Sequence, residues 1–579
     1  MQPPTPNDPT TPDGLTRVEA TIEGAGVPAP PPPRRGRRVA VIAVAAVVGL
    51  AGVAAAASFM ALRGSSETIT TKLPADTDVV VTAYLDPAAS QKVNLFRLTS
   101  SFPSLGGESE VTGRAGDWVD SMLTQTGLTH DDLGWVGSQV ALAIDVRPDA
   151  APAIALLLDT TDETAAEVSL RALRDGPMLQ GVSWSQEDHG GVRAWASHAG
   201  DVYTAIVDGT VVITNDAGTL DGIVAASSGG VPALAEDQDF VDTMAGLPQG
   251  RLGLVYVAPD DLLAVLDRIE GPGLSDIGTA AGVDPHAIRG IGMTLSAESD
   301  SMAIDTEVMF DPARLSPEQI DALGAEDHAN ALLTTVPADA LGFLGVEHLD
   351  AGLDTALADL PSDQRAALDQ SGVEPAISSL TGDLAAEVSM PAGASTPAGA
   401  VMMGTDDDEA MAAALEIAAR ALEPSTRILP YSPPPGYGVD SPSSTLGTEP
   451  QTWKTVDHDG VTVTYLPGDG GGTGIAPAYA VFDGTAVFAS SLDEAFRIID
   501  AAHGAPNVMD VERVTAALTD VPGSENVMYL DLEGVVGAVA DTGLMDPETR
   551  GDLAALQTLS LGSQSDTEHQ HARLVLRIG

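Results

Sequence analysis

The sequence predicts an α+β protein, built as a tandem duplication of a mixed, largely antiparallel sheet-plus-helices domain and preceded by one transmembrane helix. Three observations support this prediction. A long uncharged segment follows an arginine cluster near the N-terminus. Short phrases from the first half of the chain recur in the same order in the second half. Within each half, strand-like runs mix with helical patterns, which favours antiparallel sheets over a doubly wound parallel fold.

Residues 1–38 are expected to form an extended, solvated tail, because ten prolines among the first 33 residues prevent a packed core. Residues 39–62 carry no charge, and as a helix they would span about 36 Å, enough for a hydrocarbon layer of about 30 Å. Only Arg63 follows this segment closely, whereas four arginines precede it: Arg34, Arg35, Arg37 and Arg38. The positive-inside rule therefore predicts a single-pass protein of the cell membrane, with a cytoplasmic N-terminus and an extracytoplasmic C-terminal region.

A cleaved signal peptide is the alternative interpretation of the same segment, with the small residues 55–57 as a cleavage site. The leader is long for a signal peptide, and the apolar run exceeds the usual length of its hydrophobic region. The retained anchor is therefore the preferred interpretation.

Two regions, 69–310 and 331–579, carry the same phrases in the same order, which predicts two extracytoplasmic α+β repeats. The paired phrases are "LPADTDVVV" at Leu73 with "VPADALGFL" at Val336, "DHGGV" at Asp188 with "DHDGV" at Asp457, "VDGTVV" at Val207 with "FDGTAV" at Phe482, and "LPQGRLGLVYV" at Leu247 with "VPGSENVMYLD" at Val521. The last pair sets Tyr256 against Tyr529. Surplus residues of the second copy fall in a Pro/Ser/Gly stretch at 431–450, which predicts an exposed loop.

The expected elements follow the same plan in both copies. The expected strands of the first copy are 78–86, 139–145, 153–159, 192–198, 202–208 and 210–215, with a closing hairpin at 291–299 and 301–310. In the second copy 383–389 and 398–404 match the second and third strands, and 559–565 with 572–578 forms the closing hairpin. Asp208-Gly209 and Asp483-Gly484 lie between strand runs and predict tight turns, because glycine accepts positive φ.

Three helices are expected from periodicity and capping residues. The first covers 162–174, with Thr161 or Asp162 as its N-cap. The second lies near 217–227. The third covers 405–422, with Thr405 or Asp406 as its N-cap.

The composition excludes several classes of function. With 27 basic and 83 acidic residues the net charge is −56, which opposes binding to nucleic acid and to anionic lipid headgroups. The chain has no cysteine, so disulfides, thiolate nucleophiles and thiolate metal sites are excluded.

Asp188-His189 and Asp457-His458 are the most tempting chemical pairs, since histidine serves as a base or metal ligand. Each pair precedes a glycine between strands, so a polar hairpin tip is the preferred interpretation. Adjacent strand residues also point to opposite faces, which weakens cooperation within each pair.

Other candidates have simpler explanations. The acidic run 405–409 lacks the ligand pattern of a calcium loop and suits the first turn of a helix. The glycine-rich run 468–474 lacks the Lys and Ser/Thr of a phosphate-binding loop. The tryptophans are interpreted as packing residues: Trp118, Trp135, Trp184, Trp195 and Trp453. The sequence therefore assigns no catalytic, cofactor-binding or metal-binding residue, and no cofactor.

The Pro-rich tail, the segment "RRGRRVAVIAVAAVVGL" at 34–50 and the segment "LPADTDVVVTAYLDPAASQKVNLFRLTSSFPSL" at 73–105 carry a family resemblance. The chain resembles a family of uncharacterised actinobacterial membrane proteins defined by a domain of unknown function. The resemblance implies a single-pass protein that faces the cell surface, and it implies no catalytic residues.

The preferred hypothesis is a non-enzymatic envelope protein whose duplicated region binds or scaffolds an envelope protein or cell-wall polymer, at a groove between the copies. The alternative is an envelope hydrolase or transferase that uses carboxylates as acid and base. A sensor that signals inward is a third hypothesis, limited by the short tail.

Overall fold

The fold is seen in a computed structural model of the 579-residue chain. The structure describes residues 68–102, 128–147, 150–259, 285–323, 328, 330–349, 353, 357, 360, 362–391, 396–422, 452–467, 476–523, 526–541 and 545–579. Several predictions lie outside these residues: the tail 1–38, the anchor 39–62, Trp118, the loop 431–450 and the glycine-rich run 468–474. Among the helices within the described residues, none has the length and apolarity needed to cross a membrane.

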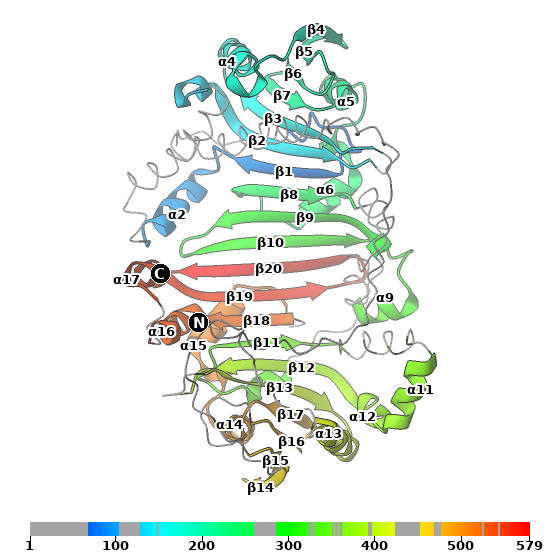
Figure 1. The fold of residues 1–579 in the computed structure, drawn as a ribbon, viewed down its shortest axis with the longest axis vertical. Helices are drawn as coiled ribbons and strands as arrows, with labels where there is room; N and C mark the ends of the chain where they lie inside the picture. Colours follow the sequence, from blue (N-terminus) through cyan, green and yellow to red (C-terminus); the bar gives the residue numbers. More distant parts are fainter. Residues whose placement is uncertain are drawn as a thin grey trace, which may run out of the picture.

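The described strands form one antiparallel sheet that runs the length of the molecule (Figure 1). The first half contributes β1 (Val79–Tyr84), β2 (Val136–Asp145), β3 (Ala153–Thr160), β4 (Trp184–His189), β5 (Val192–Ser197), β6 (Tyr203–Val207), β7 (Thr210–Thr214), β8 (Gly253–Val257), β9 (Ile288–Ala297) and β10 (Ser301–Phe310). The second half contributes β11 (Gly342–Val346), β12 (Leu380–Ser389), β13 (Ala398–Thr405), β14 (Lys454–His458), β15 (Val461–Tyr465), β16 (Ala478–Phe482), β17 (Thr485–Ala489), β18 (Asn526–Asp531), β19 (Leu556–Ser565) and β20 (His569–Ile578). The predicted α+β class is confirmed.

The strand pairings of the two halves correspond one to one. In the first half the order across the sheet is β4-β5-β6-β7-β3-β2-β1-β8-β9-β10. In the second half it is β14-β15-β16-β17-β13-β12-β11-β18-β19-β20. Tyr256 pairs with Val80 in the first half, and Tyr529 pairs with Phe343 at the corresponding place in the second.

The halves are joined edge to edge by β10 and β20, which pair over nine positions from Ser301↔Arg577 to Met309↔His569. Asp305 lies opposite Arg573, near the middle of this pairing, and the two side chains form an ion pair of 3.0 Å. The junction is therefore a continuous stretch of sheet.

Helices cover the two faces of the sheet unequally. The described helices and 3₁₀ segments of the first half are α2 (Ala89–Thr99), η2 (His130–Leu133), α4 (Glu163–Asp175), η3 (Pro177–Leu179), α5 (Ala217–Ser227), η4 (Leu234–Glu236), α6 (Gln238–Ala245), η5 (Pro285–Ala287) and α9 (Pro317–Leu323). Those that follow are η6 (Ala331–Thr335), α11 (Ser362–Ser371), α12 (Glu374–Ile377), α13 (Asp408–Leu422), α14 (Leu492–Ala502), η7 (Val508–Asp510), α15 (Glu512–Thr519), α16 (Leu532–Asp541) and α17 (Pro547–Leu553).

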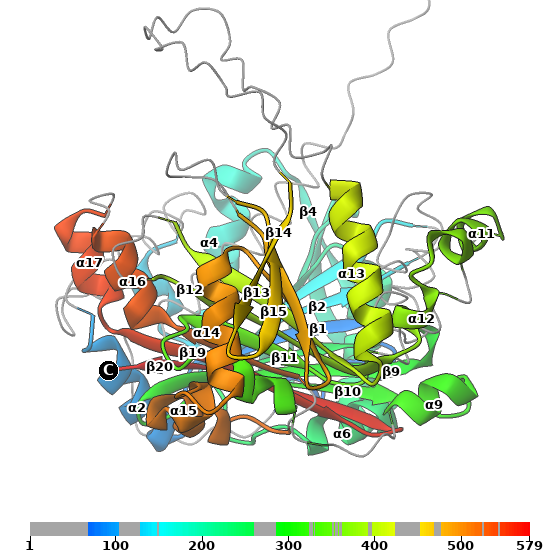
Figure 2. The same ribbon diagram turned by 90° about the horizontal axis from the view of Figure 1, so that it is seen from below.

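The main core lies on one face, which we call the covered face. There α5 and α6 bury the apolar side chains of the first half, and Phe240 of α6 packs edge-on against Tyr256 at 4.9 Å between ring centroids. In the second half α14 and α15 do the same over Phe343 and Tyr529, whose rings stack at 5.5 Å. Figure 2 shows α6 and α15 on one side of the central strands. Helices α4 and α13 pack on the opposite face, but only near its two ends.

Local sequence explains the helix starts and the tight turns. Asp162 caps α4, since its carboxylate accepts the N–H groups of Thr164 and Ala165 at 2.9 and 3.0 Å, which settles one predicted cap. The predicted cap of α13 was wrong: Asp407, and neither Thr405 nor Asp406, accepts the N–H groups of Glu409 and Ala410.

The recurring Asp-Gly turn is confirmed. Asp208 and Gly209 have φ values of 46° and 72°, and Asp483 and Gly484 have values of 46° and 76°. Positive φ at both central residues defines the two-residue hairpin turn that matches the twist of a sheet. The phrase therefore recurs because the β6–β7 turn recurs as the β16–β17 turn.

Candidate functional site

The two Asp-His pairs lie at hairpin tips, as the turn interpretation predicts. Asp188 accepts the N–H of Gly191 at 3.1 Å and thereby closes the β4–β5 turn. His189 is buried, and its Nδ1 lies 2.7 Å from Oδ1 of Asp221 on α5. In the second half Asp457 accepts the N–H of Gly460 in the same way. His458 lies 2.7 Å from Asp500 on α14. These histidines tie a hairpin to a helix.

The acidic run and the tryptophans also have structural rather than chemical roles. Asp408 and Glu409 form the first turn of α13, where the positive end of the helix dipole stabilises their negative charges. Trp135 is buried and donates to Oγ of Ser169 at 2.9 Å. Trp453 donates to the carbonyl of Ala419 at 3.1 Å. Trp195 lies under the guanidinium of Arg174. The described tryptophans therefore pack the molecule, as expected.

The face opposite the covered face carries an apolar surface that the sequence did not indicate. One row of directly paired residues crosses eleven strands, from β1 to β17: Ala83, Gly253, Leu295, Ile304, Leu574, Leu561, Met528, Leu344, Ala386, Val401 and Phe488. At about 4.8 Å between strands, the row is about 48 Å long. We call the face that carries it the open face.

The open face is accessible to solvent along much of this row. Six of its aliphatic side chains are between 37% and 41% exposed: Val81, Met293, Leu295, Leu344, Val388 and Val401. Figure 1 shows the central strands with no described helix across them. Helices α2 and α16 lie at one end of these strands, and α9 lies at the other. The open face thus carries a continuous row of apolar side chains, more extended than the scattered apolar residues of an ordinary surface.

The open face extends further over the second half than over the first. Val401 and Phe488 are 37% and 38% exposed, whereas the corresponding Leu156 and Ile213 are 2% and 4% exposed. In the first half α4 and Trp135 pack over that end of the sheet. The matching end of the second half has a smaller cluster under α13.

A polar cavity of about 530 Å³ lies at the junction on the covered face, lined by residues of both halves. Glu307 of β10 is buried there and lies within 3.1 Å of Nδ1 of both His569 and His571 of β20. The hydrogen bond to Glu307 raises the pKa of His571 above its ordinary value. On the other side of the Asp305–Arg573 pair, the matching positions are apolar, with Ala303 against Val575.

A second cavity of about 530 Å³ belongs to the first half alone. Its lining includes Ala143, Thr219 and Gly222. The corresponding positions of the second half, at the same strand register and helix turn, hold Glu387, Glu494 and Arg497. These larger side chains occupy the space, and Arg497 pairs with Glu494 at 2.8 Å.

The carboxyl groups of Glu387 and Glu494 are the closest approach to the acid–base pair that a hydrolase would need. Burial, followed by the nearby charge of Glu494, raises the pKa of Glu387 to about 9. Both glutamates are buried, and neither lines either cavity. The two carboxyl groups are therefore shielded from solvent.

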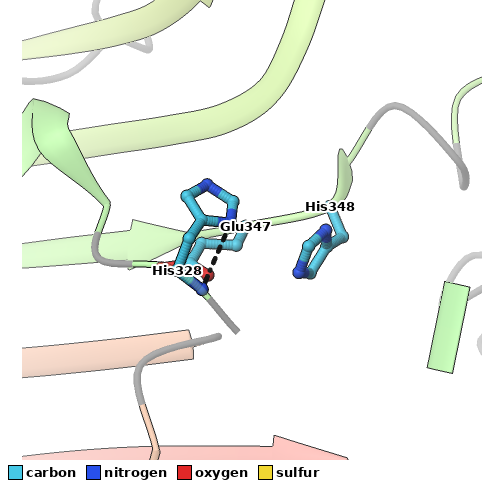
Figure 3. A group of neighbouring side chains, drawn as sticks. All are labelled: His328, Glu347 and His348. Atoms are coloured by element: carbon cyan, nitrogen blue, oxygen red, sulfur yellow. Dashed lines mark hydrogen bonds and ion pairs between the residues drawn. The ribbon is translucent and has the colours of Figure 1, made fainter. Parts of the chain in front are cut away.

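His328, Glu347 and His348 form a small cluster at the end of β11 (Figure 3). Each offers one ligand atom, and these atoms lie within 4.8 Å of one another. Nδ1 of His328 lies 3.4 Å from Oε2 of Glu347, whose side chain is 0% exposed. Burial raises the pKa of Glu347. Among the described residues this is the one group of three such side chains close enough to share a metal ion.

Sequence reasoning missed this cluster because its members are not grouped in the chain. His328 precedes η6, whereas Glu347 and His348 follow β11, so only the packing of the segment before η6 against the end of β11 brings them together. One signal was present: alignment of the phrases at Leu73 and Val336 sets Tyr84 and Leu85 against Glu347 and His348. Acidic and imidazole side chains in one half, at positions where the other half has Tyr84 and Leu85, mark a site specific to that half.

The comparisons with known proteins give a family without an activity. Residues 39–390 match the family described as "Protein of unknown function (DUF3352)". No curated protein sequence matches the chain. Two solved structures titled "Structure of crystal form III of TP0453" and "Structure of crystal form IV of TP0453" are similar with a TM-score of 0.23 each, at 11% and 10% identity. The alignments cover 46% and 42% of this chain and 90% and 81% of those chains.

Proposed function

Since the chain belongs to the DUF3352 family of proteins of unknown function, we propose its function from its own geometry: it is a non-enzymatic envelope protein that binds the acyl chains of lipids along the open face. The observation that carries this proposal is the apolar row from Ala83 to Phe488, with aliphatic side chains up to 38% exposed. Each CH₂ group moved from water onto such a surface contributes about 0.8 kcal/mol.

The chemistry of the open face favours lipid over a cell-wall polymer. Phe488, at its far end, is the one aromatic side chain of the row, whereas sugar recognition relies on aromatic faces and hydrogen-bond partners. The backbone N–H groups of the central strands already pair with neighbouring strands, so these strands offer no free backbone donors to a glycan. A second copy of the chain is a poorer occupant, because a net charge of −56 on each copy opposes close approach.

The proposed placement also favours lipid. Residues 39–62 anchor the chain in the cell membrane with residues 1–38 in the cytoplasm, and Thr68, only a few residues beyond the anchor, donates its N–H to Gln139 of β2. This short spacing holds the extracytoplasmic region next to the bilayer. The acidic surface opposes adsorption of the protein onto anionic headgroups. The open face therefore binds single acyl chains, and the protein does not lie flat on the membrane.

We further propose that 69–310 and 331–579 arose as a tandem duplication, which the matched phrases and the one-to-one strand pairing support. Duplication accounts for the length of the open face, because the pairing of β10 with β20 joins two sheets into one.

The test uses the full chain in the membranes of cells that incorporate a photoactivatable fatty acid. After illumination, labelled peptides are mapped by mass spectrometry. We expect label on peptides from 288–310 and 556–578. Leu295→Glu and Leu344→Glu should each lower that label about tenfold, because a charged side chain on the open face opposes contact with an acyl chain. Val168→Glu, on the exposed surface of α4, is the matched control and keeps the label.

The predicted anchor serves as the internal standard, since peptides from 39–62 take up the probe in every variant. Label confined to these peptides, with none on the open face, rejects the proposal. Crosslinked dimers through the open face in place of lipid adducts would assign that face to a second copy of the chain.

A further inference from the structure

The cluster at the end of β11 brings two imidazole rings and a buried carboxylate together, and the inference drawn from it is independent of lipid binding. Nε2 of His328 lies 2.8 Å from Oδ1 of Asp383, so this nitrogen carries the hydrogen that the carboxylate accepts. Nδ1 of His328 lies 3.4 Å from Oε2 of Glu347, which also accepts the backbone N–H of His328 at 3.3 Å. A cation held by the His328 ring and the buried Glu347 carboxylate would offset the cost of burying that negative charge.

Two further atoms of the cluster lack partners. Oε1 of Glu347 and Nε2 of His348 are buried, and neither has a hydrogen-bond partner among the described residues. Buried polar atoms without partners are uncommon in folded proteins. Figure 3 shows the His348 ring across from His328 and Glu347. His348 also has a φ of 59°, a left-handed backbone conformation that costs a non-glycine residue energy.

We propose that His328, Glu347 and His348 bind one divalent transition-metal ion of the zinc class, and that Asp383 is a positioning residue for His328. Two imidazoles and one carboxylate suit zinc and its neighbours, whereas calcium and magnesium prefer sites made of oxygen alone. With ligand bonds of about 2.0–2.1 Å, adjacent ligand atoms of a tetrahedral site lie about 3.4 Å apart. The His328–Glu347 separation has this value.

Asp383 completes the arrangement that metal-binding histidines usually have, in which the second ring nitrogen donates to a carboxylate. Hydrogen bonds also fix the segment of His328 against the strands: Asn330 is buried and donates to the carbonyls of Val346 and Leu384 at 3.1 and 3.0 Å. The proposed ligands therefore lie next to a strand end that side-chain hydrogen bonds hold in place.

The first half lacks this site. The register that pairs Tyr84 with Gln139 there corresponds to Glu347 opposite Asp383 in the second half. Tyr84 accepts a hydrogen bond from Arg251, and Gln139 accepts the N–H groups of Thr68 and Ile69. Three protein ligands leave a fourth position for water or another donor, and the His328 side chain is 46% exposed.

The test is metal binding by the full chain in detergent micelles, after chelator treatment, at physiological salt and with excess magnesium to block loose binding to the acidic surface. We expect one zinc ion per chain with micromolar or tighter affinity. His328→Ala and His348→Ala should each weaken binding by about 100-fold, and Asp383→Asn by about tenfold. His571→Ala is the matched control, because His571 also contacts a buried glutamate, and it should leave the affinity unchanged.

A second measurement does not depend on loss of binding. The chain has no cysteine, so Glu347→Cys introduces a unique thiol, and cobalt bound at the site should then show a new thiolate-to-cobalt absorption band. Absence of stoichiometric zinc binding in the wild-type chain overturns the proposal. So does wild-type affinity in both histidine variants, or a cobalt spectrum that Glu347→Cys leaves unchanged.

Discussion

The two halves of the molecule share one set of strand pairings but differ at three corresponding places. Ala143, Thr219 and Gly222 leave a cavity in the first half, where Glu387, Glu494 and Arg497 fill the second. A Tyr–Gln pair in the first half corresponds to the Glu347–Asp383 pair beside the proposed metal site. The open face is closed at the far end of the first half and exposed at that of the second.

This difference teaches that the backbone pairing and the chemistry of the sites are set by separate groups of residues. Alternate strand positions on the covered face keep each half folded, with Tyr256 and Tyr529 buried at matching places. The positions that differ lie within β12 and β13, at the end of β11, and on α14. A search for function in a protein with two similar halves should therefore begin where the halves disagree.

The largest effect is expected at the one place that both halves share, the Asp305–Arg573 pair. Asp305 is 1% exposed, and its removal takes away one of the two carboxylates that Arg573 contacts, the other being that of Glu298. We expect Asp305→Ala to lower the free energy of unfolding by about 3 kcal/mol, the lower end for a broken buried pair, because Glu298 stays beside the arginine; urea denaturation measures this loss. The double variant Asp305→Leu/Arg573→Met replaces both charges and should recover most of that loss.

If Asp305→Ala and the double variant are equally unstable, packing rather than an uncompensated charge holds the junction. If the two halves of Asp305→Ala unfold in separate transitions, the pair is what couples them.

A smaller effect is expected in the pH dependence of stability, and it comes from Glu387 in the second half, where the first half has the cavity at Ala143. Burial raises the pKa of Glu387 to about 9, so the folded protein holds this proton more tightly than the unfolded chain does. The stability that Glu387 contributes is complete below its unfolded pKa, and it is lost as pH rises toward about 9. Glu387→Gln should therefore stabilise the protein at pH 8 relative to the wild type, by on the order of 1–3 kcal/mol, and much less at pH 5.

Thermal or urea unfolding at both pH values measures this difference. Glu416→Gln, on the exposed surface of α13, is the control and should change stability equally at both pH values. A Glu387→Gln variant with the same stability relative to wild type at pH 5 and pH 8 contradicts the buried, protonated carboxyl.

The smallest effect concerns the recurring turn. Gly209 and Gly484 both have left-handed φ, so alanine at either position should cost about 1 kcal/mol in unfolding free energy. A Cβ at Gly209 meets no atom within 4 Å, whereas at Gly484 it lies 3.2 Å from the carbonyl oxygen of Thr405. Gly484→Ala should therefore be the more destabilising of the two in parallel denaturation curves. Equal costs would show that the Thr405 contact adds nothing.

Much of the fold was predictable because its signals are local. The helix expected near 217–227 is α5 with those same bounds, and the expected strand at 301–310 is β10. The Asp-Gly turns follow from two residues alone. The cap of α13 was misplaced because four polar residues, Thr405 to Asp408, compete for one position, and only the geometry selects Asp407.

The remainder was not predictable because it depends on contacts between distant segments. Nothing in β10 or β20 alone indicates that Asp305 meets Arg573. The open face required the relative register of eleven strands, since each strand taken alone shows only ordinary alternation. The cluster of His328 with Glu347 depends on how η6 crosses the end of β11.

The pairing of β10 with β20 has a consequence for the order in which the chain matures. The ion pair at its centre joins residues 268 positions apart, so the edge of β10 has no partner until 569–578 have been made and delivered. Long-range pairing of this kind slows folding, and an unpaired edge beside apolar side chains favours misassociation before folding is complete. The first half therefore needs either a chaperone on the edge of β10 or rapid folding of the second half, until β20 pairs with β10.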